Sequence, residues 1–228
     1  MIKVYLVSIG NLNPHDSIYS KLISKERLEK SRRYLKEKDK ALSIAAELIL
    51  NYAIKENYPE IKCPMKFEKN PYGKIFIKEF PEINFNISHS GDYAVCALSE
   101  ADVGIDIEKI RPISIDIAER FFTEKEYKFI MNKPQAQRLS CFYRLWVLKE
   151  SYMKARGLGF NLPLKDFCIN FDKAITVFEQ GGFKDCSFYE FNIDCYKLAV
   201  CKLSKTCDKD VTIECVNLKE CLNKLLDA

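Results

Sequence analysis

Two carboxylates lie close together in the segment VGIDIEK, residues 103–109. Alternation along a strand places Asp106 and Glu108 on one face and Ile105 and Ile107 on the other. Two carboxylates on one face repel each other unless a positive group lies between them. A hard divalent cation, with Mg²⁺ as the first candidate, takes carboxylate oxygens and keeps positions open for water and phosphate. A solvated edge strand explains the same pair equally well at this level.

A third carboxylate lies in the distant segment RLWVLKESYMKARG. Glu150 and Lys154 are four residues apart, so a helix would place them on one face. An exposed i,i+4 ion pair of this kind stabilises a helix by only ~0.3–0.5 kcal/mol. In the functional alternative, Glu150 is a third metal ligand and Lys154 contacts phosphate or handles a proton. The spacing leaves both interpretations open.

One of the two histidines, His89, stands between Ser88 and Ser90, just after a predicted strand. A loop there could direct an imidazole and two hydroxyls at a bound anion, although a structural histidine is the commoner case.

Basic residues could add phosphate contacts. Lys74 follows a predicted turn, and Arg27, Lys30, Arg32 and Arg33 lie on one basic helix, which is otherwise a solvated face.

Taken together, these side chains suggest metal-assisted chemistry at a polyphosphate. The chain has no G-x-x-x-x-G-K-[ST] segment, which disfavours a P-loop NTPase. It also has no GxSxG segment, which disfavours a serine hydrolase of that type.

The elements that must position these residues follow an α+β pattern. In the first half we expect a strand at 1–10, a charged helix at 24–40, a buried helix at 41–58, a hairpin at 66–80 and strands within 83–109. The charged helix would have Leu28 and Leu35 as its sparse apolar face. In the second half we expect helices at 114–122, 123–132 and 141–157, followed by strands at 167–171, 175–179, 187–193 and 197–203. Thr123 and Glu126 form a capping-box pattern, and Gly157 ends the third of these helices.

Composition indicates a soluble, cytoplasmic protein. The net charge of +4 is too small to indicate a non-specific nucleic-acid binder, and no stretch approaches the ~18 apolar residues of a membrane span. Ten cysteines without a CxxC segment are expected to be mostly buried thiols in a reducing compartment. His15 and His89 are too few and too far apart for a zinc site.

A weak internal repeat divides the chain. Residues 85–87 recur as 191–193 and residues 94–96 recur as 199–201, at separations of 106 and 105 positions. The helices around 46–48 and 148–150 would then correspond. Two similar α+β halves, joined near 109–112, would explain the repeat, and chance similarity between apolar strands is the alternative. Ligands favour interfaces between such halves, so we expect a site at the seam.

The motifs FNISHSG, GIDIEK, RFF and LWVLKESYMKARGLGFNLPL stand in the order and spacing of a known family. From the SKERLEKSRRY segment to the AVCKLS segment, the chain resembles the large, surfactin-synthetase-activating (Sfp) type of 4'-phosphopantetheinyl transferase. The resemblance implies a monomer of two pseudo-symmetric halves with coenzyme A in the cleft between them. Residues 1–109 would carry the CoA and metal-binding motifs, and residues 110–228 would carry the WxxKES helix.

The resemblance also implies the reaction and the partners. The 4'-phosphopantetheine arm passes from coenzyme A to a serine of an apo acyl or peptidyl carrier protein, and 3',5'-ADP is released. The metal is Mg²⁺, with Mn²⁺ as an alternative, and neither nucleic acid nor membrane takes part. Which carrier protein, and whether it serves fatty-acid, polyketide or nonribosomal peptide synthesis, is left open.

Residue roles carry over by motif. Asp106, Glu108 and Glu150 would hold the metal, Glu150 being also the family's expected base, while Lys154 and His89 would contact phosphate oxygens. Further contacts to the CoA phosphates would come from Arg27, Lys30 and Lys74, with Ser88 beside them.

Two further regions bear on the binding of coenzyme A and of the carrier protein. Similar proteins carry an arginine near the start of the first buried helix, where this chain has Leu42, which bears on adenine-side binding. Residues 111–125, with Ile113, Phe121 and Phe122 exposed, would form part of a basic and apolar rim for the carrier protein.

Two other functions remain as alternatives. A CoA-binding module without turnover would bind coenzyme A tightly and transfer nothing. A metal-dependent phosphodiesterase would cleave nucleotide diesters without any carrier protein.

Overall fold

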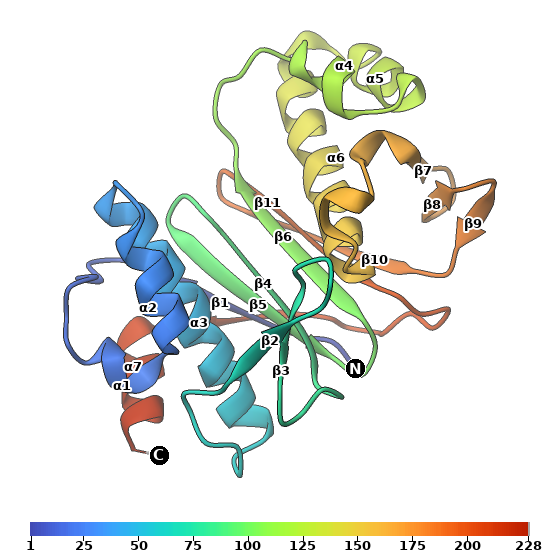
Figure 1. Ribbon diagram of the computed structural model, residues 1–228. Coiled ribbons are helices and arrows are strands. Elements are labelled where there is room, and N and C mark those ends of the chain that lie inside the picture. The colour runs from blue at the N-terminus through green and yellow to red at the C-terminus, as the bar shows by residue number, and fades with distance from the viewer. Residues whose placement is uncertain (228) are drawn as a thin grey trace. The chain divides into compact units, whose positions relative to one another are not determined.

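A computed structural model describes residues 1–227, with Phe160 described by its backbone alone (Figure 1). Its contacts divide the chain into two compact units. The first unit comprises Met1–Glu68, Ile75–Glu100 and Asp210–Ala228, and the second comprises Lys69–Lys74 and Ala101–Lys209. The predicted halves were continuous segments, whereas each of these units is assembled from separate parts of the chain.

The first unit is built on a four-stranded sheet in the order β12-β1-β5-β4. Its strands are β1 (Lys3–Ser8), β4 (Asn84–Ser90), β5 (Tyr93–Ser99) and β12 (Ile213–Val216). Only the β1–β12 pair is parallel. A short hairpin joins β2 (Phe67–Lys69) to β3 (Ile75–Ile77) around the predicted turn.

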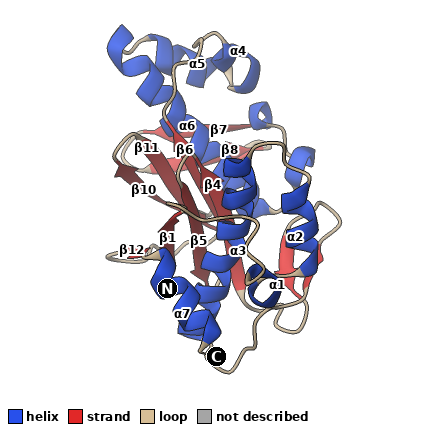
Figure 2. Cartoon of the chain, turned by 90° about the vertical axis from the view of Figure 1, so that its left-hand side faces the viewer, coloured by secondary structure: helices blue, strands red, loops and turns tan. Residues whose placement is uncertain are grey.

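Helix α3 (Glu37–Asn57) supplies the core of this unit and packs on β1, β4 and β5 (Figures 1 and 2). Its apolar residues are buried almost continuously from Ala41 to Ile54, as the sequence predicted. The remaining helices of the unit are α1 (Tyr19–Leu22), α2 (Lys25–Arg32) and α7 (Leu218–Leu226), and α7 packs beside α3.

The basic helix is shorter than the sequence predicted. It ends at Arg32, and Lys36 adopts an extended backbone conformation before α3 begins. Leu35 is therefore not part of an apolar helix face, and 98% of it is exposed. Ser24 caps the start of α2 by accepting a hydrogen bond from the backbone amide of Arg27.

The second unit is built on a three-stranded antiparallel sheet in the order β10-β11-β6. Its strands are β6 (Val103–Lys109), β10 (Ser187–Ile193) and β11 (Tyr196–Lys202), and α6 (Gln135–Arg156) packs on β6 and β11. Before α6 come α4 (Ile117–Phe121) and α5 (Glu124–Met131). After α6 come two short 3₁₀ turns (Gly159–Asn161 and Leu164–Asp166) and a small sheet of β7 (Phe167–Phe171), β8 (Ile175–Glu179) and β9 (Gly182–Lys184).

Each unit repeats one order of elements. A strand (β1 or β6) precedes a long helix (α3 or α6), and an antiparallel hairpin follows (β4–β5 or β10–β11). In both units the second hairpin strand pairs antiparallel with the first strand. The predicted α+β class is therefore confirmed, and the sequence repeat corresponds to this shared topology.

The cysteines differ from the expectation. All ten are free thiols, yet only Cys96, Cys201 and Cys221 are buried. Cys195, Cys207 and Cys215 are exposed, and four others are half-buried. Within residues 1–227, no helix has both the length and the apolar character needed to cross a lipid bilayer.

Candidate active site

The acidic strand β6 lies directly beneath helix α6. A side chain at Gly104 would overlap the carbonyl oxygen of Ser151 and the amide nitrogen of Ala155. The absence of a Cβ therefore lets the helix approach the strand closely. This contact lies two residues from Asp106 on the strand and within one turn of both Glu150 and Lys154 on the helix, so it sets the position of all three.

Asp106 is a buried carboxylate rather than part of a solvated edge. Only 4% of it is exposed, and it lies opposite Ala199 of β11. Its Oδ1 accepts a hydrogen bond from Lys154 Nζ at 2.6 Å, and the same ammonium donates to the carbonyl oxygen of Ile105 at 3.2 Å. Lys154 thus donates hydrogen bonds to two residues of β6, whereas its spacing on the helix had suggested a surface ion pair with Glu150. A buried charge needs such a partner, because desolvation disfavours an isolated one.

Glu150 lies near both acids of the strand. Burial raises the pKa of its carboxyl to about 7, the negative charges of Asp106 and Glu108 add to this rise, and Lys154 opposes it. Because each of these three groups shifts the pKa of Glu150, the structure brings all four predicted side chains into one electrostatic cluster. We call Asp106, Glu108, Glu150 and Lys154 the acidic cluster.

The chemistry of the acidic cluster suits a hard divalent cation. Three carboxylates offer oxygen ligands, and their mutual repulsion would be relieved by a positive ion. No group of three or more His, Cys, Asp or Glu side chains within the described chain has the arrangement of a formed metal site. Shared metal binding by Asp106, Glu108 and Glu150 therefore stays a prediction.

Lys74 belongs to the same unit as the acidic cluster. Its ammonium donates hydrogen bonds to Asp102 Oδ1 at 2.7 Å and to the carbonyl oxygen of Ala155 at 3.0 Å. The side chain of Asn70 donates to the carbonyl oxygen of Gly157 at 2.9 Å. The turn of the β2–β3 hairpin is thus fixed to the C-terminal end of α6, at positions one and three residues beyond Lys154.

The other predicted contacts lie in the first unit. Ser88 and His89 are inside strand β4 rather than in a loop after it, and His89 is paired with Ala94 of β5. Arg27 lies on α2, where its Nε donates to Oε2 of the buried Glu47 at 3.1 Å. Lys30 is exposed on the same helix.

Two family models together match residues 13–201. Residues 102–201 match the "4'-phosphopantetheinyl transferase superfamily", and residues 13–101 match "4'-phosphopantetheinyl transferase, N-terminal". The 4'-phosphopantetheinyl transferase Sfp of Bacillus subtilis is 34% identical over 86% of this chain and 88% of its own length. The 4'-phosphopantetheinyl transferase gsp of Aneurinibacillus migulanus is 37% identical over 100% of this chain and 97% of its own. The chain belongs to the 4'-phosphopantetheinyl transferase family.

Solved structures of holo-[acyl-carrier-protein] synthases match this transferase more weakly. The synthase of Thermotoga maritima has a TM-score of 0.40 and 22% identity, covering 46% of this chain and 64% of that one. The synthase of Bacillus anthracis, in complex with CoA (3',5'-ADP), has a TM-score of 0.41 and 19% identity, covering 45% of this chain and 95% of that one.

The transferase has an apolar cavity beside Glu150 that the sequence analysis did not predict. It has a volume of about 420 Å³ and lies within the second unit. Its lining consists of Arg120, Phe121, Trp146, Glu150, Met153, Leu162, Pro163, Leu164 and Lys165. Trp146 and Met153 precede and follow Glu150 by about one helical turn, so this apolar face of α6 was the available sequence signal. The apolar lining accounts for the desolvation of the Glu150 carboxyl.

The rim predicted for residues 111–125 is only partly exposed. Ile113 is exposed and Phe121 is half-buried. The expectation for Phe122 was wrong, because it is 1% exposed and packs against Phe142 and Trp146. Both rings contact Trp146, but of the two only Phe121 lines the cavity beside Glu150.

Leu42 occupies a core position of α3. Only 4% of this side chain is exposed, and it packs in the apolar core of the first unit. Its side chain therefore contributes to the stability of that unit, and its effect on nucleotide binding stays a prediction.

Proposed function

We propose that this transferase moves the 4'-phosphopantetheine arm of coenzyme A to a serine hydroxyl of an apo acyl or peptidyl carrier protein and releases 3',5'-ADP. The observation that supports it most is the acidic cluster, in which carboxylates from β6 and α6 share one electrostatic environment with Lys154. The enzyme is proposed to act in the cytoplasm as a monomer.

In this proposal Asp106, Glu108 and Glu150 hold Mg²⁺. When bound, the ion would neutralise the pyrophosphate and stabilise the charge that develops on the leaving group. Carboxylate oxygens are the ligands that Mg²⁺ prefers, which supports this assignment over a site for a softer metal.

Glu150 is the proposed acceptor of the serine proton. In the metal-free protein the pKa of Glu150 is about 7, and a bound cation would lower it, so the carboxylate would be ionised at neutral pH and able to accept a proton. The proton of the serine hydroxyl would pass to the carboxylate of Glu150 as the oxygen attacks phosphorus. Holding both reactants in place supplies much of the remaining rate enhancement.

The basic residues are proposed to bind the phosphates of coenzyme A. Arg27, Lys30, Lys74, His89 and Lys154 would supply these contacts, with Ser88 alongside. The hydrogen bonds of Arg27 and Lys74 to Glu47 and Asp102 hold these cations in defined positions, which lowers the entropy lost on binding.

The test is transfer to purified apo carrier proteins of fatty-acid, polyketide and nonribosomal peptide synthesis. Incubation with coenzyme A and Mg²⁺ should add the mass of one phosphopantetheine to at least one of them. We expect Asp106→Asn to lower kcat/KM at least ~100-fold, since removing one stabilising group from such a site costs on the order of 3 kcal/mol. Asp172→Asn, on an exposed loop of the same unit, should leave the rate unchanged.

Measurements of coenzyme A binding and of nucleotide diester cleavage separate the two alternative functions. Tight binding of coenzyme A without transfer to any carrier would favour a CoA-binding module. Metal-dependent cleavage of a nucleotide diester in the absence of a carrier would favour a phosphodiesterase. Equal transfer rates of the Asp106→Asn and wild-type proteins would show that the acidic cluster is not required for the reaction.

A further inference from the structure

The net charge of this protein is concentrated in one short segment. Residues 25–40 contain eight of the 36 Lys and Arg residues and four of the 32 Asp and Glu residues. The segment therefore has a net charge of +4, equal to the formal net charge of the chain, and the other residues include 28 of each sign. Helix α2 and the start of α3 thus carry an excess of positive charge that the remainder does not share.

At least four of the eight cations are engaged with carboxylates. Arg27 pairs with the buried Glu47, and Lys38 pairs with Asp92 at the β4–β5 turn. Lys40 pairs with Glu37, and Lys25 lies 4.0 Å from Glu29. The Arg27 pair joins α2 to α3 and the Lys38 pair joins α3 to the β4–β5 turn. Each of the four pairs offsets a positive charge and contributes little to long-range attraction.

Three cations of the segment keep their charge exposed. Arg32, Arg33 and Lys36 lie on the surface, at the end of α2 and in the connection to α3. None of the three makes an ion pair with any residue between 1 and 227. We call these three residues the α2 patch.

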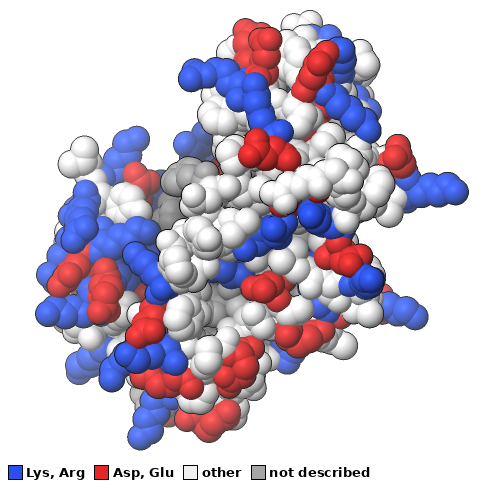
Figure 3. Space-filling view, turned by 45° about the vertical axis from the view of Figure 1, so that its right-hand side comes forward, with Lys and Arg blue, Asp and Glu red and all other residues white. Residues whose placement is uncertain are grey.

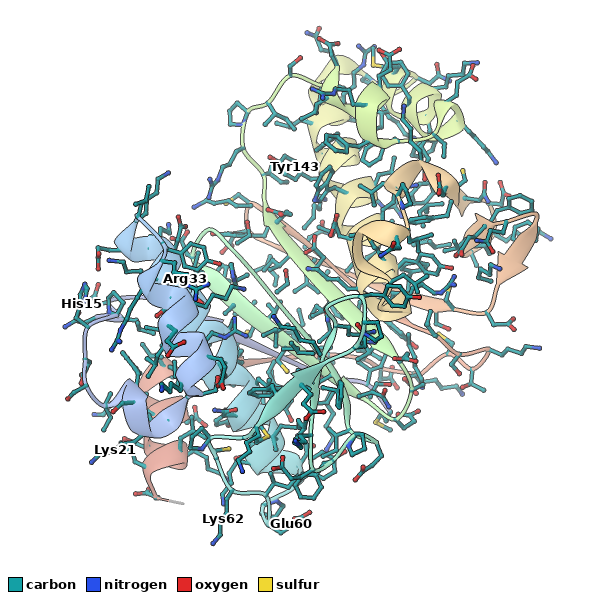
Figure 4. All side chains as sticks on the ribbon, in the orientation of Figure 1. His15, Lys21, Arg33, Glu60, Lys62 and Tyr143 are labelled. Carbon is teal, nitrogen blue, oxygen red and sulfur yellow. The ribbon has the colours of Figure 1, made fainter. Side chains whose placement is uncertain are left out.

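The figures place the α2 patch at one end of the first unit. Lys and Arg side chains gather on the left-hand side of Figure 3, over the region where Figure 1 shows α2. Arg33 lies at the upper end of α2 in Figure 4, whereas Lys21 and Lys62 lie at the lower end of the same unit. The patch begins two residues after Lys30, and α-helical geometry places Arg33 only ~4.5 Å further along the axis than Lys30.

We propose that the α2 patch is an electrostatic entry surface that draws polyanionic coenzyme A toward Arg27 and Lys30 without binding it in the final complex. The inference rests on the proposed function, in which coenzyme A is the substrate and Arg27 and Lys30 contact its phosphates. Exposed charges act over about one Debye length, ~8 Å at physiological ionic strength, so Arg32 and Arg33, within one helical turn of Lys30, are within range. Charges of this kind raise association rates more than they lengthen the lifetime of a complex.

The chemistry of the segment favours a compact anion over an extended one. Glu29, Glu37 and Asp39 interrupt the basic residues, and the rest of the chain has no excess of positive charge. A nucleic acid or an anionic membrane is recognised by a positive stripe or face with many contacts. Coenzyme A, a small molecule with a pyrophosphate and a 3'-phosphate, is a compact polyanion that a local patch of three exposed cations can attract.

The test measures association directly and needs no turnover. Stopped-flow binding of coenzyme A should give an association rate constant at least about threefold lower for Arg32→Gln/Arg33→Gln/Lys36→Gln than for the wild type at 50 mM NaCl, with the dissociation rate constant unchanged. At 500 mM NaCl the two proteins should associate equally fast, because the Debye length falls to ~4 Å. Dephospho-CoA carries less negative charge, so its association rate should fall less.

A matched control separates the patch from net charge. The variant Lys21→Gln/Lys62→Gln/Lys219→Gln removes the same charge from exposed positions elsewhere in the first unit and should retain the wild-type association rate. An equal loss of rate in this control would overturn the proposal, as would an increase in dissociation rate confined to the α2 patch variant.

The outcomes distinguish this inference from the proposed function. If coenzyme A associates as expected but no carrier protein is modified, the role of the α2 patch is supported and the proposed transfer reaction is wrong. If transfer proceeds and the patch variant raises the KM of the carrier protein instead of that of coenzyme A, the surface serves the protein partner and the proposal is wrong.

Discussion

At the scale of single residues, Glu150 has the most unusual environment in the candidate site. Its carboxyl is desolvated by the apolar cavity and lies near two other carboxylates. A side chain retained under these conditions destabilises the metal-free protein whenever it is ionised. Such an unfavourable arrangement is typical of functional sites.

This environment predicts a pH dependence of stability. The folded-state pKa of about 7 lies above the ordinary glutamate pKa of 4.5, so the neutral form stabilises the folded state at low pH. That contribution is fully present below pH ~4.5 and is lost as the pH rises through about 7. In EDTA, Glu150→Gln should therefore gain roughly 1–3 kcal/mol over the wild type on going from pH 5 to pH 8.

Urea denaturation at both pH values measures this difference. The exposed Glu119→Gln variant is the control and should follow the wild-type pH dependence. If Glu150→Gln also follows the wild type, the carboxyl is not held in the environment described here.

At the scale of elements, α6 is the part that organises the second unit. It packs on β6 through Gly104, on the β2–β3 turn through its C-terminal end, and on α5 and β7 through Lys149. Two of these contacts give predictions with matched controls.

The contact at Gly104 predicts an asymmetry between two glycines. A Cβ at Gly104 would overlap the backbone of α6, whereas a Cβ at Gly182 of β9 meets nothing within 4 Å. Gly104→Ala should cost about 3 kcal/mol or more, because overpacking against backbone leaves little room to adjust. Gly182→Ala should change stability by less than ~0.5 kcal/mol, because the added methyl group meets no neighbouring atom in this half-buried position. Thermal unfolding of the two variants tests this, and similar melting temperatures would contradict it.

The second prediction compares the loss of stability on replacing the buried Lys149 and the exposed Lys128. It is 0% exposed, and its ammonium donates hydrogen bonds to both carboxylate oxygens of Glu126 and to the carbonyl of Phe167. Glu126 also closes the capping box of α5 with Thr123. Lys149→Met would leave this buried carboxylate uncompensated, which costs about 3–5 kcal/mol.

The exposed Lys128–Glu124 pair on α5 provides the control for Lys149. Lys128→Met should cost less than ~1 kcal/mol, since solvent screens an exposed pair. Chemical denaturation gives both values, and a loss of less than 1 kcal/mol in Lys149→Met would show that the buried pair is dispensable.

At the scale of the whole molecule, the two units use their cysteines in the same way. Each unit buries at least one thiol in its sheet or core, and each has exposed thiols in an edge strand, a turn or a loop. Burial raises the pKa of Cys96 and Cys221 and keeps these thiols protonated. Reactivity should therefore divide the ten cysteines according to exposure.

Labelling with an aromatic disulfide reagent tests this division. In the folded protein, Cys195, Cys207 and Cys215 should react first, while Cys96, Cys201 and Cys221 should react only after unfolding in urea. Peptide mass mapping identifies the labelled residues. Rapid labelling of Cys96 in the native protein would contradict the burial of this residue in the core of the first unit.

Much of the molecule followed from local sequence patterns. Alternating apolar residues predicted the strands, the apolar run from Ala41 to Ile54 predicted a buried helix, and Thr123 with Glu126 predicted the start of α5. The motifs also indicated the family and singled out Asp106, Glu108, Glu150 and Lys154, since these signals depend only on residue type and spacing.

Other features were decided by tertiary structure. The break between α2 and α3, the burial of Phe122 and the pairing of Lys154 with Asp106 depend on which surfaces meet. The same is true of the C-terminal strand β12, which returns to pair with β1 and so makes the first unit discontinuous in sequence. Periodicity specifies which face of an element is apolar, but it does not specify the partner that covers that face, because any complementary surface buries a similar apolar area. The sequence by itself therefore determined most of the elements, though not α1, α7, β9 or β12, together with the family and the chemical groups. Packing decided their neighbours, their charge partners and the cavity beside Glu150.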